Sequence, residues 1–379
     1  MSTLPVSYRP ISLLPYLSKL SEKIIKSRID EHINNNKIIT EEQFGFRNNH
    51  STVDQLARMV NNITANFNDK KHTGAIFLDL AKAFDNVWHS GLIYKMIKLN
   101  FPVNLIFLVN SYLSKREFVV VINGVKSISH SIYTGVPQGT VLGPLLFLIY
   151  TNDAPVTKLV HSSIFADDKG LYTNSFRVDT IKNRLEKATK SNIKFFRKWK
   201  ISLNSDKTES IFFSKRRPVI DQNVRVNENI IEWSKNVKHL GLILDRKLNF
   251  NSHIDMVIQR ATIMLITLYP LLNKKSKLST INKLNIYKSI VRPIMTYACP
   301  VWNLISKYNM NRLQVMQNKF LRLAGNYRMF TLVFIMHTEL KIETIRTYIK
   351  KCSINYFNRA INHPNSLVSN MMGIPHFRE

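Results

Sequence analysis

The spacing of apolar residues changes twice along the chain, and this change limits the possible folds more than any other feature. Toward both ends of the 379-residue chain, apolar residues recur every three or four positions, which predicts amphipathic helices. Between these ends, short runs rich in β-branched and aromatic residues predict strands. The sequence therefore predicts an α+β fold in three parts, helical, then mixed, then helical again. We expect soft boundaries near residues 70 and 248.

Individual segments make this expectation specific. The predicted helices include residues 17–33, 178–199, 281–290 and 311–323. The predicted strands include residues 75–80, 117–123 and 210–213. Asn123-Gly124 is a turn signal at the end of the second of these strands. Residues 164–172 predict a strand, a tight turn and a second strand, with Asp167 and Asp168 at the turn.

The chain is strongly basic, with 54 Lys and Arg against 25 Asp and Glu and a formal net charge of +29. Such a surplus repels itself unless an anionic partner neutralises it. Nucleic acid is the usual partner, and an anionic membrane surface is the second. We expect two basic clusters to line a long charged channel, with a solvated surface as the alternative for any single residue. These clusters are Lys194, Arg197, Lys198 and Lys200, and Lys274, Lys275 and Lys277.

Cysteine usage and hydropathy narrow the class of protein. The two cysteines, Cys299 and Cys352, lie far apart in the sequence, so neither a zinc knuckle nor a disulfide framework is predicted. No stretch approaches the roughly 18 apolar residues of a membrane span. No secretory signal stands at the start. We therefore expect an intracellular protein with no membrane partner.

Three aspartates are candidates for a metal site. Asp79 closes an apolar run, where an isolated carboxylate is costly without a cation, although a helix N-cap is the alternative. Asp167 and Asp168 are adjacent, and their repulsion raises the pKa of at least one of them unless a cation is bound. A solvated turn is the alternative for this pair. Nucleotidyl transfer needs two divalent ions about 3.5–4 Å apart, and magnesium prefers such hard oxygen ligands.

Residues 135–144 form a predicted loop that contains several glycines and prolines, and an apolar helix is predicted to follow it. Its glycines, among them Gly139, allow a backbone to approach a ligand closely. The amide of Gln138 can hydrogen-bond a base or a sugar, with a purely structural glutamine as the alternative. This loop favours a ligand site over two unrelated acidic turns.

Eight segments, in the same order along the chain, resemble the conserved sequence blocks of reverse transcriptases. Their residues are most similar to those of non-LTR retrotransposons of the jockey type. Residues 77–85, 135–144 and 165–168 resemble blocks A, B and C. Residues 203–208 and 238–241 resemble block D and the primer grip. Two fingers blocks and a thumb region correspond to residues 8–14, to residues 43–47 with His50-Ser51-Thr52, and to residues 292–302. The resemblance spans roughly residues 8–325, with a weaker tail at His363-Pro364-Asn365.

The resemblance implies a right-hand polymerase with helical fingers, an antiparallel-sheet palm and a helical thumb. The expected subdomains are residues 1–70 (first part of the fingers), 71–248 (palm with the remaining fingers segments), 249–325 (thumb) and 326–379 (a C-terminal helical region). The family's aspartate triad corresponds to Asp79, Asp167 and Asp168, which would be both catalytic and metal-binding. The metal would be Mg²⁺, as two ions, with Mn²⁺ possible.

The remaining site residues follow from the same resemblance. Arg47 corresponds to the residue that clasps the triphosphate, and its forked guanidinium suits phosphate. Phe84 corresponds to the aromatic that blocks a ribose 2′-hydroxyl, whereas Gln138 and Gly139 lie beside the nucleotide. Lys207 corresponds to the lysine proposed to protonate pyrophosphate. Primer contacts would come from His239, Leu240 and Gly241, although His239 could instead pack locally. Lys169, unusual after the aspartates, could pair with a carboxylate or contact the primer.

The implied activity is RNA-directed DNA synthesis, with a template RNA, a primer DNA and deoxynucleoside triphosphates as partners. The implied location is intracellular, and nuclear during integration; the sequence leaves the oligomeric state open. Relatives usually begin with an endonuclease domain, and none precedes the fingers block here. We therefore expect a fragment, a truncated copy or a frame from a decayed element. The alternatives are a catalytically inactive nucleic-acid-binding remnant, or another right-hand polymerase such as an intron maturase or an RNA-templated RNA polymerase.

Overall fold

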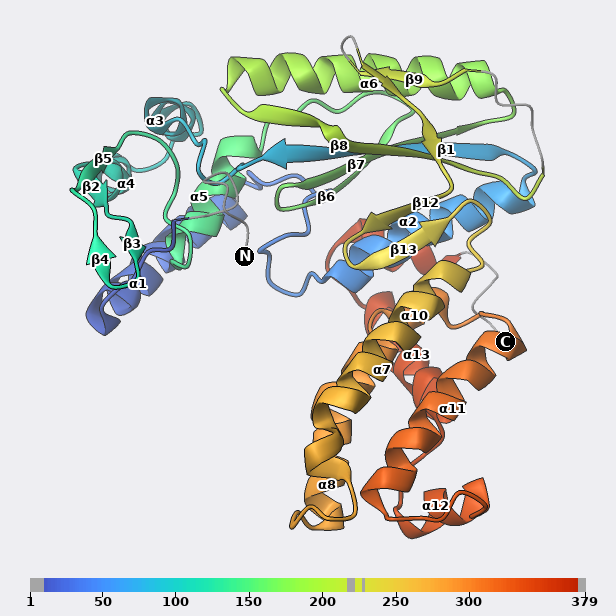
Figure 1. Cartoon of the computed structure of the whole chain (residues 1–379). Coiled ribbons are helices and arrows are strands. Elements are labelled where there is room, and N and C mark those ends of the chain that lie inside the picture. Colours follow the sequence, from blue (N-terminus) through green and yellow to red (C-terminus); the bar gives the residue numbers. More distant parts are fainter. Residues whose placement is uncertain (1–9, 217–221, 227–228, 374–379) are drawn as a thin grey trace. The chain divides into compact units, whose positions relative to one another are not determined.

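The structure is a computed structural model that describes residues 10–216, 222–226 and 229–373. The chain forms two compact units, each assembled from three segments (Figure 1). The first unit comprises Met1–His50, Gly74–Ser210 and Ile220–Trp233. The second unit comprises Ser51–Thr73, Ile211–Val219 and Ser234–Glu379. The expected boundaries near residues 70, 248 and 325 stay predictions.

A five-stranded sheet organises the first unit. Its strand order is β11-β8-β1-β7-β6, so strands far apart in the sequence are neighbours. The strands are β1 (His72–Ala81), β6 (His161–Phe165), β7 (Asp168–Ser175), β8 (Ser202–Phe213) and β11 (Trp233–Ser234). Strands β6 and β7 form an antiparallel hairpin, as residues 164–172 predict. Strand β8 begins eight residues before the predicted strand 210–213, because its first half is too polar to show an apolar run.

The 21-residue helix α6 (Val178–Lys198) covers one face of this sheet (Figure 1). A Cβ added to Gly74 of β1 would lie 2.4 Å from Ile181 of α6, so the glycine permits close packing. Lys169 of β7 faces the same helix and donates from Nζ to Asn192 Oδ1 at 2.5 Å. Because strand side chains alternate between faces, residues 79 and 168 lie on the face away from α6.

Helices α1 (Tyr16–Asn35), α3 (His89–Lys98), α4 (Val103–Leu113) and α5 (Leu142–Thr151) complete the first unit, with six short strands. These strands are β2 (Arg116–Phe118), β3 (Val121–Ile122), β4 (Val125–Lys126), β5 (His130–Ile132), β9 (Val224–Val226) and β10 (Asn229–Ile231). The predicted strand 117–123 is therefore interrupted at residues 119 and 120. The predicted Asn123-Gly124 turn is confirmed, with φ of 50° and 83° in the two residues.

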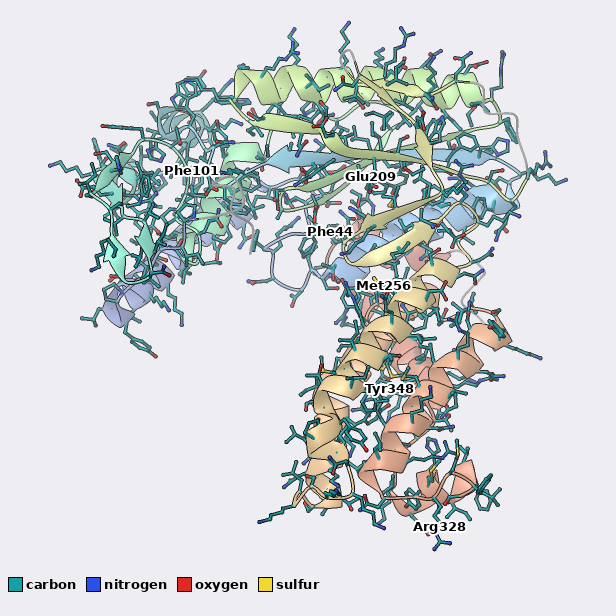
Figure 2. All side chains as sticks on the ribbon, viewed as in Figure 1. Phe44, Phe101, Glu209, Met256, Arg328 and Tyr348 are labelled. Atoms are coloured by element: carbon teal, nitrogen blue, oxygen red, sulfur yellow. The ribbon has the colours of Figure 1, made fainter. Side chains whose placement is uncertain are left out.

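The second unit is mainly helical. It contains α2 (Thr52–Asn68), the hairpin β12 (Asn236–His239) and β13 (Leu242–Asp245), α7 (Asn251–Leu272), α8 (Thr280–Ile286) and the π-helix η2 (Tyr287–Val291). It continues with α9 (Arg292–Thr296), α10 (Cys299–Trp302), α11 (Lys307–Ala324), α12 (Val333–Glu339), α13 (Ile345–Ile361), α14 (Ser366–Ser369) and η3 (Asn370–Gly373). Trp302, Tyr287 and Phe320 are fully buried in its core. The Arg292 guanidinium lies 4.2 Å from the centre of the Tyr348 ring, which Figure 2 labels.

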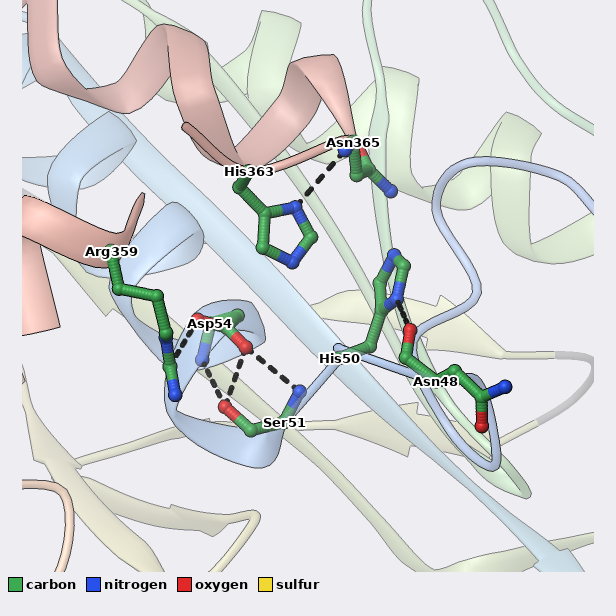
Figure 3. A network of polar contacts seen from close by, with 7 residues as sticks. All are labelled: Asn48, His50, Ser51, Asp54, Arg359, His363 and Asn365. Atoms are coloured by element: carbon green, nitrogen blue, oxygen red, sulfur yellow. Dashed lines mark hydrogen bonds and ion pairs between the residues drawn. The ribbon is translucent and has the colours of Figure 1, made fainter. Parts of the chain in front are cut away.

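Within this unit, the end of α13 and helix α14 lie against the start of α2. Ser51 and Asp54 form a capping box, in which each side chain accepts from the other residue's backbone N–H at 3.2 and 2.8 Å. Arg359 of α13 places Nη2 3.5 Å from Asp54 Oδ1 (Figure 3). Asn365 donates from its backbone N–H to His363 Nδ1 at 3.0 Å. The C-terminal region is therefore tied to α2 by a buried carboxylate.

Helix α7 and the two cysteines bear on the expected class of protein. Helix α7 is long and apolar enough to cross a membrane by length and composition, with 22 % of the relevant window buried, so the expectation that no stretch approaches this length was wrong. Buried helices of soluble proteins pass the same test, and α7 carries Asp255 in an ion pair with Arg312 at 2.7 Å. The two cysteines are free thiols. Burial is the main cause that raises the pKa of Cys299 to about 12, and the nearby Cys352 thiol is the second. The two cysteines, far apart in the sequence, are therefore neighbours in the structure.

Candidate active site

The predicted acidic turn is a two-residue hairpin loop. Phe165 pairs with Asp168, which leaves Ala166 and Asp167 as the loop. Ala166 has a φ of 58°, a value that suits glycine at the first position of such a turn but strains a residue with a Cβ. This strain requires support from elsewhere in the first unit.

Gln43 supplies that support. Its Oε1 accepts from the backbone N–H of Ala166 at 2.9 Å and of Gly45 at 2.8 Å, and its Nε2 donates to the Ala166 carbonyl at 3.4 Å. Phe44 also donates from its backbone N–H to Ile164 O at 2.9 Å. A Cβ on Gly45 would lie 2.2 Å from the Ala166 nitrogen, so only glycine allows this approach. The family resemblance covers residues 43–47, but no local sequence pattern identifies Gln43 as the residue that supports the hairpin.

The hairpin brings the predicted aspartates together. Desolvation, followed by the charges of Asp167 and then Asp79, raises the pKa of Asp168 from 3.8 to about 6. Asp168 keeps contact with solvent, yet protein atoms crowd its carboxylate on the remaining sides. Asp79 and Asp167 are half-buried. Asp167 and Asp79 therefore both act electrostatically on Asp168, as repulsion between the adjacent acids predicted.

These donors fit a hard divalent cation. Within the described residues, no group of three or more His, Cys, Asp or Glu side chains is arranged to hold a metal ion by itself. Magnesium does not require such a group, since one or two carboxylates with substrate phosphates suffice. A cation would also relieve the repulsion that raises the pKa of Asp168. The arrangement is therefore suited to an ion that arrives with an anionic substrate.

Phe84 lies on the loop that follows β1. Its ring stacks on Phe147 of α5, with centroids 4.5 Å apart and planes inclined by 29°. Phe46 meets the same ring edge-on at 6.0 Å. The side chain of Phe84 is only half-buried, so part of the ring stays accessible. This position allows the predicted gate, and packing alone would also explain it.

Side chains from outside the loop of residues 135–144 hydrogen-bond to it and to the start of α5. Gln138 donates from Nε2 to Asp85 Oδ1 at 2.6 Å, and Gly139 is exposed with a φ of 84°. The buried Glu22 of α1 accepts from the backbone N–H groups of Val141 and Leu142 at 2.6 and 3.3 Å. Glu22 therefore caps α5 from outside that helix. Neither Asp85 nor Glu22 was predicted, because the pairs lie 53 and about 120 residues apart in sequence.

Basic residues near the site differ in their environments. Arg47 is half-buried and donates from Nη1 to the carbonyls of Thr40 and Gln43 at 3.0 and 3.2 Å, so it closes its own loop. Burial lowers the pKa of Arg47. Lys207 is exposed on β8. Lys169 is 4 % exposed, and burial lowers its pKa to about 8. Lys169 points toward α6 and donates to Asn192, so the expected primer contact was wrong. The carboxylate that acts on its charge is Glu42 and not one of the three aspartates.

The predicted α6 cluster lies away from the aspartates. Lys194, Arg197 and Lys198 are exposed on α6, whose buried side packs on the sheet face opposite the aspartates. The expectation that these residues line a long charged channel stays a prediction. Periodicity identified the helix correctly but could not show which face of the sheet it covers.

The predicted primer-grip residues form the β12–β13 turn of the second unit. Leu240 and Gly241 are its two loop residues, with φ of 45° and 81°. His239 is only 5 % exposed, and this burial lowers its pKa to about 3. Both observations favour the alternative in which the side chain packs locally. Tyr297 donates from its hydroxyl to Leu240 O at 2.7 Å, and its ring lies 3.0 Å from where a Gly241 Cβ would stand.

We expect Tyr297→Phe to loosen this turn without unfolding the second unit. The substitution keeps the ring but removes the hydrogen bonds of the hydroxyl with Leu240 O and with Thr52 Oγ1, so the free energy of unfolding should fall by about 1–2 kcal/mol. Chemical denaturation measures that change, and the Michaelis constant for primer–template should rise severalfold. Tyr269→Phe, on the exposed part of α7, is the matched control. An unchanged Michaelis constant for primer–template would show that the turn does not contact the primer.

Comparison with known proteins identifies the family. The family model described as reverse transcriptase (RNA-dependent DNA polymerase) matches residues 3–244. A probable RNA-directed DNA polymerase from transposon X-element of Drosophila melanogaster is 37% identical over 378 residues, covering 96% of this chain and 40% of that protein. The polymerase from mobile element jockey of Drosophila funebris is 35% identical over 370 residues, covering 95% and 40%. The chain thus spans about two fifths of the length of these relatives.

Among solved structures, apo telomerase from Candida tropicalis covers 93% of this chain and 61% of its own, at 12% identity and a TM-score of 0.42. A likeness this weak carries no argument. The α+β class is confirmed by the described elements, and the predicted resemblance to jockey-type polymerases is confirmed by the relatives. With its family match over residues 3–244 and with relatives of at least 33% identity along nearly its whole length, the chain belongs to the reverse transcriptase family.

Proposed function

We propose that this chain is the polymerase part of a non-LTR retrotransposon protein and adds deoxynucleotides to a primer 3′-hydroxyl on an RNA template. One observation carries the proposal: three electrostatically coupled carboxylates lie at a strained hairpin that a buried glutamine braces. Repulsion between neighbouring carboxylates destabilises a turn that has only a structural role, whereas a site for divalent ions requires carboxylates that lie close together. Family membership supports the same chemistry.

The side chains divide the work as follows. Asp79, Asp167 and Asp168 would hold two Mg²⁺ ions, which supply activation of the 3′-hydroxyl and stabilisation of the leaving pyrophosphate. Gln138, held by Asp85, would orient the nucleotide, while Phe84 would exclude a 2′-hydroxyl. Lys207 would donate a proton to pyrophosphate. Arg47 would clasp the triphosphate through its Nε and Nη2 groups, because its Nη1 donates to two loop carbonyls.

The partners proposed are a template RNA, a primer DNA and deoxynucleoside triphosphates, in the nucleus during integration. The net charge of +29 supports binding to nucleic acid. Manganese could replace magnesium, since both accept oxygen ligands.

Primer extension by the purified chain tests the proposal directly. We expect incorporation of deoxynucleotides on an RNA template in Mg²⁺, and its loss in Asp167→Ala. Asp179→Ala serves as the control, because it removes an exposed carboxylate that lies 4.0 Å from Arg177 Nη2. Incorporation retained in Asp167→Ala would refute the site assignment. Salt-sensitive binding without any incorporation would instead favour the inactive remnant.

Phe84→Ala should relax sugar selection. The truncated side chain leaves room for a 2′-hydroxyl, so the ratio of kcat/KM for deoxy- over ribonucleotides should fall at least tenfold. Single-nucleotide incorporation with dATP and ATP, which differ only at the 2′ position, measures this ratio. Phe147→Leu removes the ring that backs Phe84, and should lower the ratio by less. If Phe84→Ala keeps the wild-type ratio, Phe84 is a packing residue only.

A further inference from the structure

The outer side of α6 carries a continuous basic stripe. It comprises Lys187, Lys190, Lys194, Arg197 and Lys198, all of them exposed. At 3.6 residues per turn, these five positions fall within an arc of about 100°. The buried positions of the helix, such as Ile181, Leu185 and Phe196, occupy the opposite side and pack toward the sheet. The stripe is therefore a single surface that faces solvent.

Two layers of the first unit separate this stripe from the catalytic aspartates. Lys169 of β7 points to α6 and bonds Asn192, whereas the next side chain on that strand, Asp168, points the other way. On β1, Gly74 packs against Ile181 of α6. Asp79, five positions along, therefore belongs to the opposite face. A nucleic-acid strand at the aspartates cannot touch the stripe without passing around the edge of the sheet.

The chemistry of the stripe suits phosphate rather than bases. Residues 187–198 contain no acid. The nearest acid on the helix, Glu186, accepts from the backbone N–H of Arg225 at 2.9 Å. The two phenylalanines in this range, Phe195 and Phe196, are buried, so the stripe offers no ring for base stacking. Lysine and arginine without base-reading partners give affinity that does not depend on sequence.

We propose that this stripe binds the phosphate backbone of single-stranded RNA outside the polymerase site. The choice of RNA rests on the proposed function, because the template of such an enzyme continues as a single strand beyond the copied duplex. The stripe extends for about 16 Å along the helix axis, which accommodates a few consecutive phosphates. It would hold the template while the other face of the sheet performs synthesis.

The test compares two triple variants that lower the net charge equally, from +29 to +26. The first, Lys187→Gln, Lys190→Gln and Lys194→Gln, removes stripe charges. The control, Arg346→Gln, Lys350→Gln and Lys351→Gln, removes exposed charges from α13. The probes are a fluorescent primer–template duplex with blunt ends and the same duplex with a 20-nucleotide single-stranded RNA overhang. Binding is measured by anisotropy at several salt concentrations, and thermal melting checks that each variant is folded.

We expect the stripe variant to lose about tenfold in affinity for the overhang duplex and to match the wild type on the blunt duplex. Three lost contacts to a single strand should also reduce the slope of log K against log salt by roughly 2. An equal loss in the α13 control would assign the effect to bulk charge and overturn the proposal. Equal losses of affinity for both probes would mean that the stripe binds duplex and not single-stranded RNA. Unchanged affinity for both probes would show that the stripe does not bind nucleic acid. Either result would overturn the proposal.

Lysine acetylation read by mass spectrometry gives an independent result. Single-stranded RNA should protect Lys187, Lys190 and Lys194 while leaving Lys350 and Lys351 reactive. Labelling of the stripe at the rate of free protein would contradict the proposal. Neither measurement depends on polymerisation, so an inactive protein that shows stripe protection would refute the proposed enzyme activity but not this surface.

Discussion

Asp168→Asn should abolish primer extension and at the same time stabilise the metal-free protein. The amide keeps the size of the side chain but is a poor ligand for Mg²⁺, so kcat should fall by at least a thousandfold, an effect of roughly 4 kcal/mol. The gain in stability follows from the same carboxylate. In the absence of a cation, Asp168 carries its charge in a crowded site beside Asp79 and Asp167.

The pH dependence of this gain has a definite sign. The folded-state pKa of Asp168 is about 6, above its value of 3.8 in the unfolded chain. The folded state therefore holds a proton more tightly, and stability falls as the pH rises from about 4 to 6 and stays lower above that range. The full shift would correspond to roughly 3 kcal/mol, but solvent contact screens Asp168, so about 1 kcal/mol is expected.

Thermal unfolding in chelator, at pH 4 and at pH 7.5, measures this effect. Asp168→Asn should melt above the wild type at pH 7.5 and together with it at pH 4. Added Mg²⁺ should raise the melting temperature of the wild type at pH 7.5, less so at pH 5 where protons compete, and raise that of the variant least. Asp179→Asn, with its carboxylate exposed, should behave like the wild type throughout. A variant that melts below the wild type at pH 7.5 would show that no charge repulsion exists at the hairpin.

The sequence was sufficient for those features that depend on neighbouring residues. The Asp167-Asp168 turn, the Asn123-Gly124 turn and the amphipathic helices all follow from patterns within ten or twenty residues. The interruption of the strand at residues 119–120 and the π-helical turn after Ile286 were not predictable in this way, since neither alters the spacing of apolar residues. Local propensity describes an element, whereas its ends and irregularities depend on tertiary packing.

The supports of the site were missed for a different reason. Gln43 reaches Ala166 across 123 residues, and Tyr297 reaches Leu240 across 57. A polar side chain that satisfies a distant backbone group resembles, in sequence, any surface glutamine or tyrosine. Lys169 illustrates the converse error, because a lysine beside catalytic acids suggested a primer contact although strand alternation turned it to the other face. Family resemblance located the reacting groups, but it did not locate the groups that hold them.

Gly45→Ala should therefore damage catalysis although Gly45 touches no substrate. Its added Cβ would stand 2.2 Å from the Ala166 nitrogen, and real contacts of this kind essentially never fall below 3.0 Å. The hairpin or the 43–47 segment must yield by about 0.8 Å, the difference between these two distances. A misplacement near 1 Å at reacting groups costs about a hundredfold in rate. We expect kcat to fall by that factor and the concentration of Mg²⁺ for half-maximal rate to rise.

Gly124→Ala provides the control for backbone strain without a clash. Gly124 has a φ of 83° and no atom within 4 Å of an added Cβ, so alanine there strains a turn distant from the aspartates along the sequence. Both variants should lose about 1 kcal/mol or more of stability, yet only Gly45→Ala should change the Mg²⁺ dependence. If both variants lower kcat equally, the loss reflects general destabilisation. If Gly45→Ala keeps kcat within threefold of the wild type, the hairpin tolerates displacement, and the brace formed by Gln43 is not what positions the carboxylates.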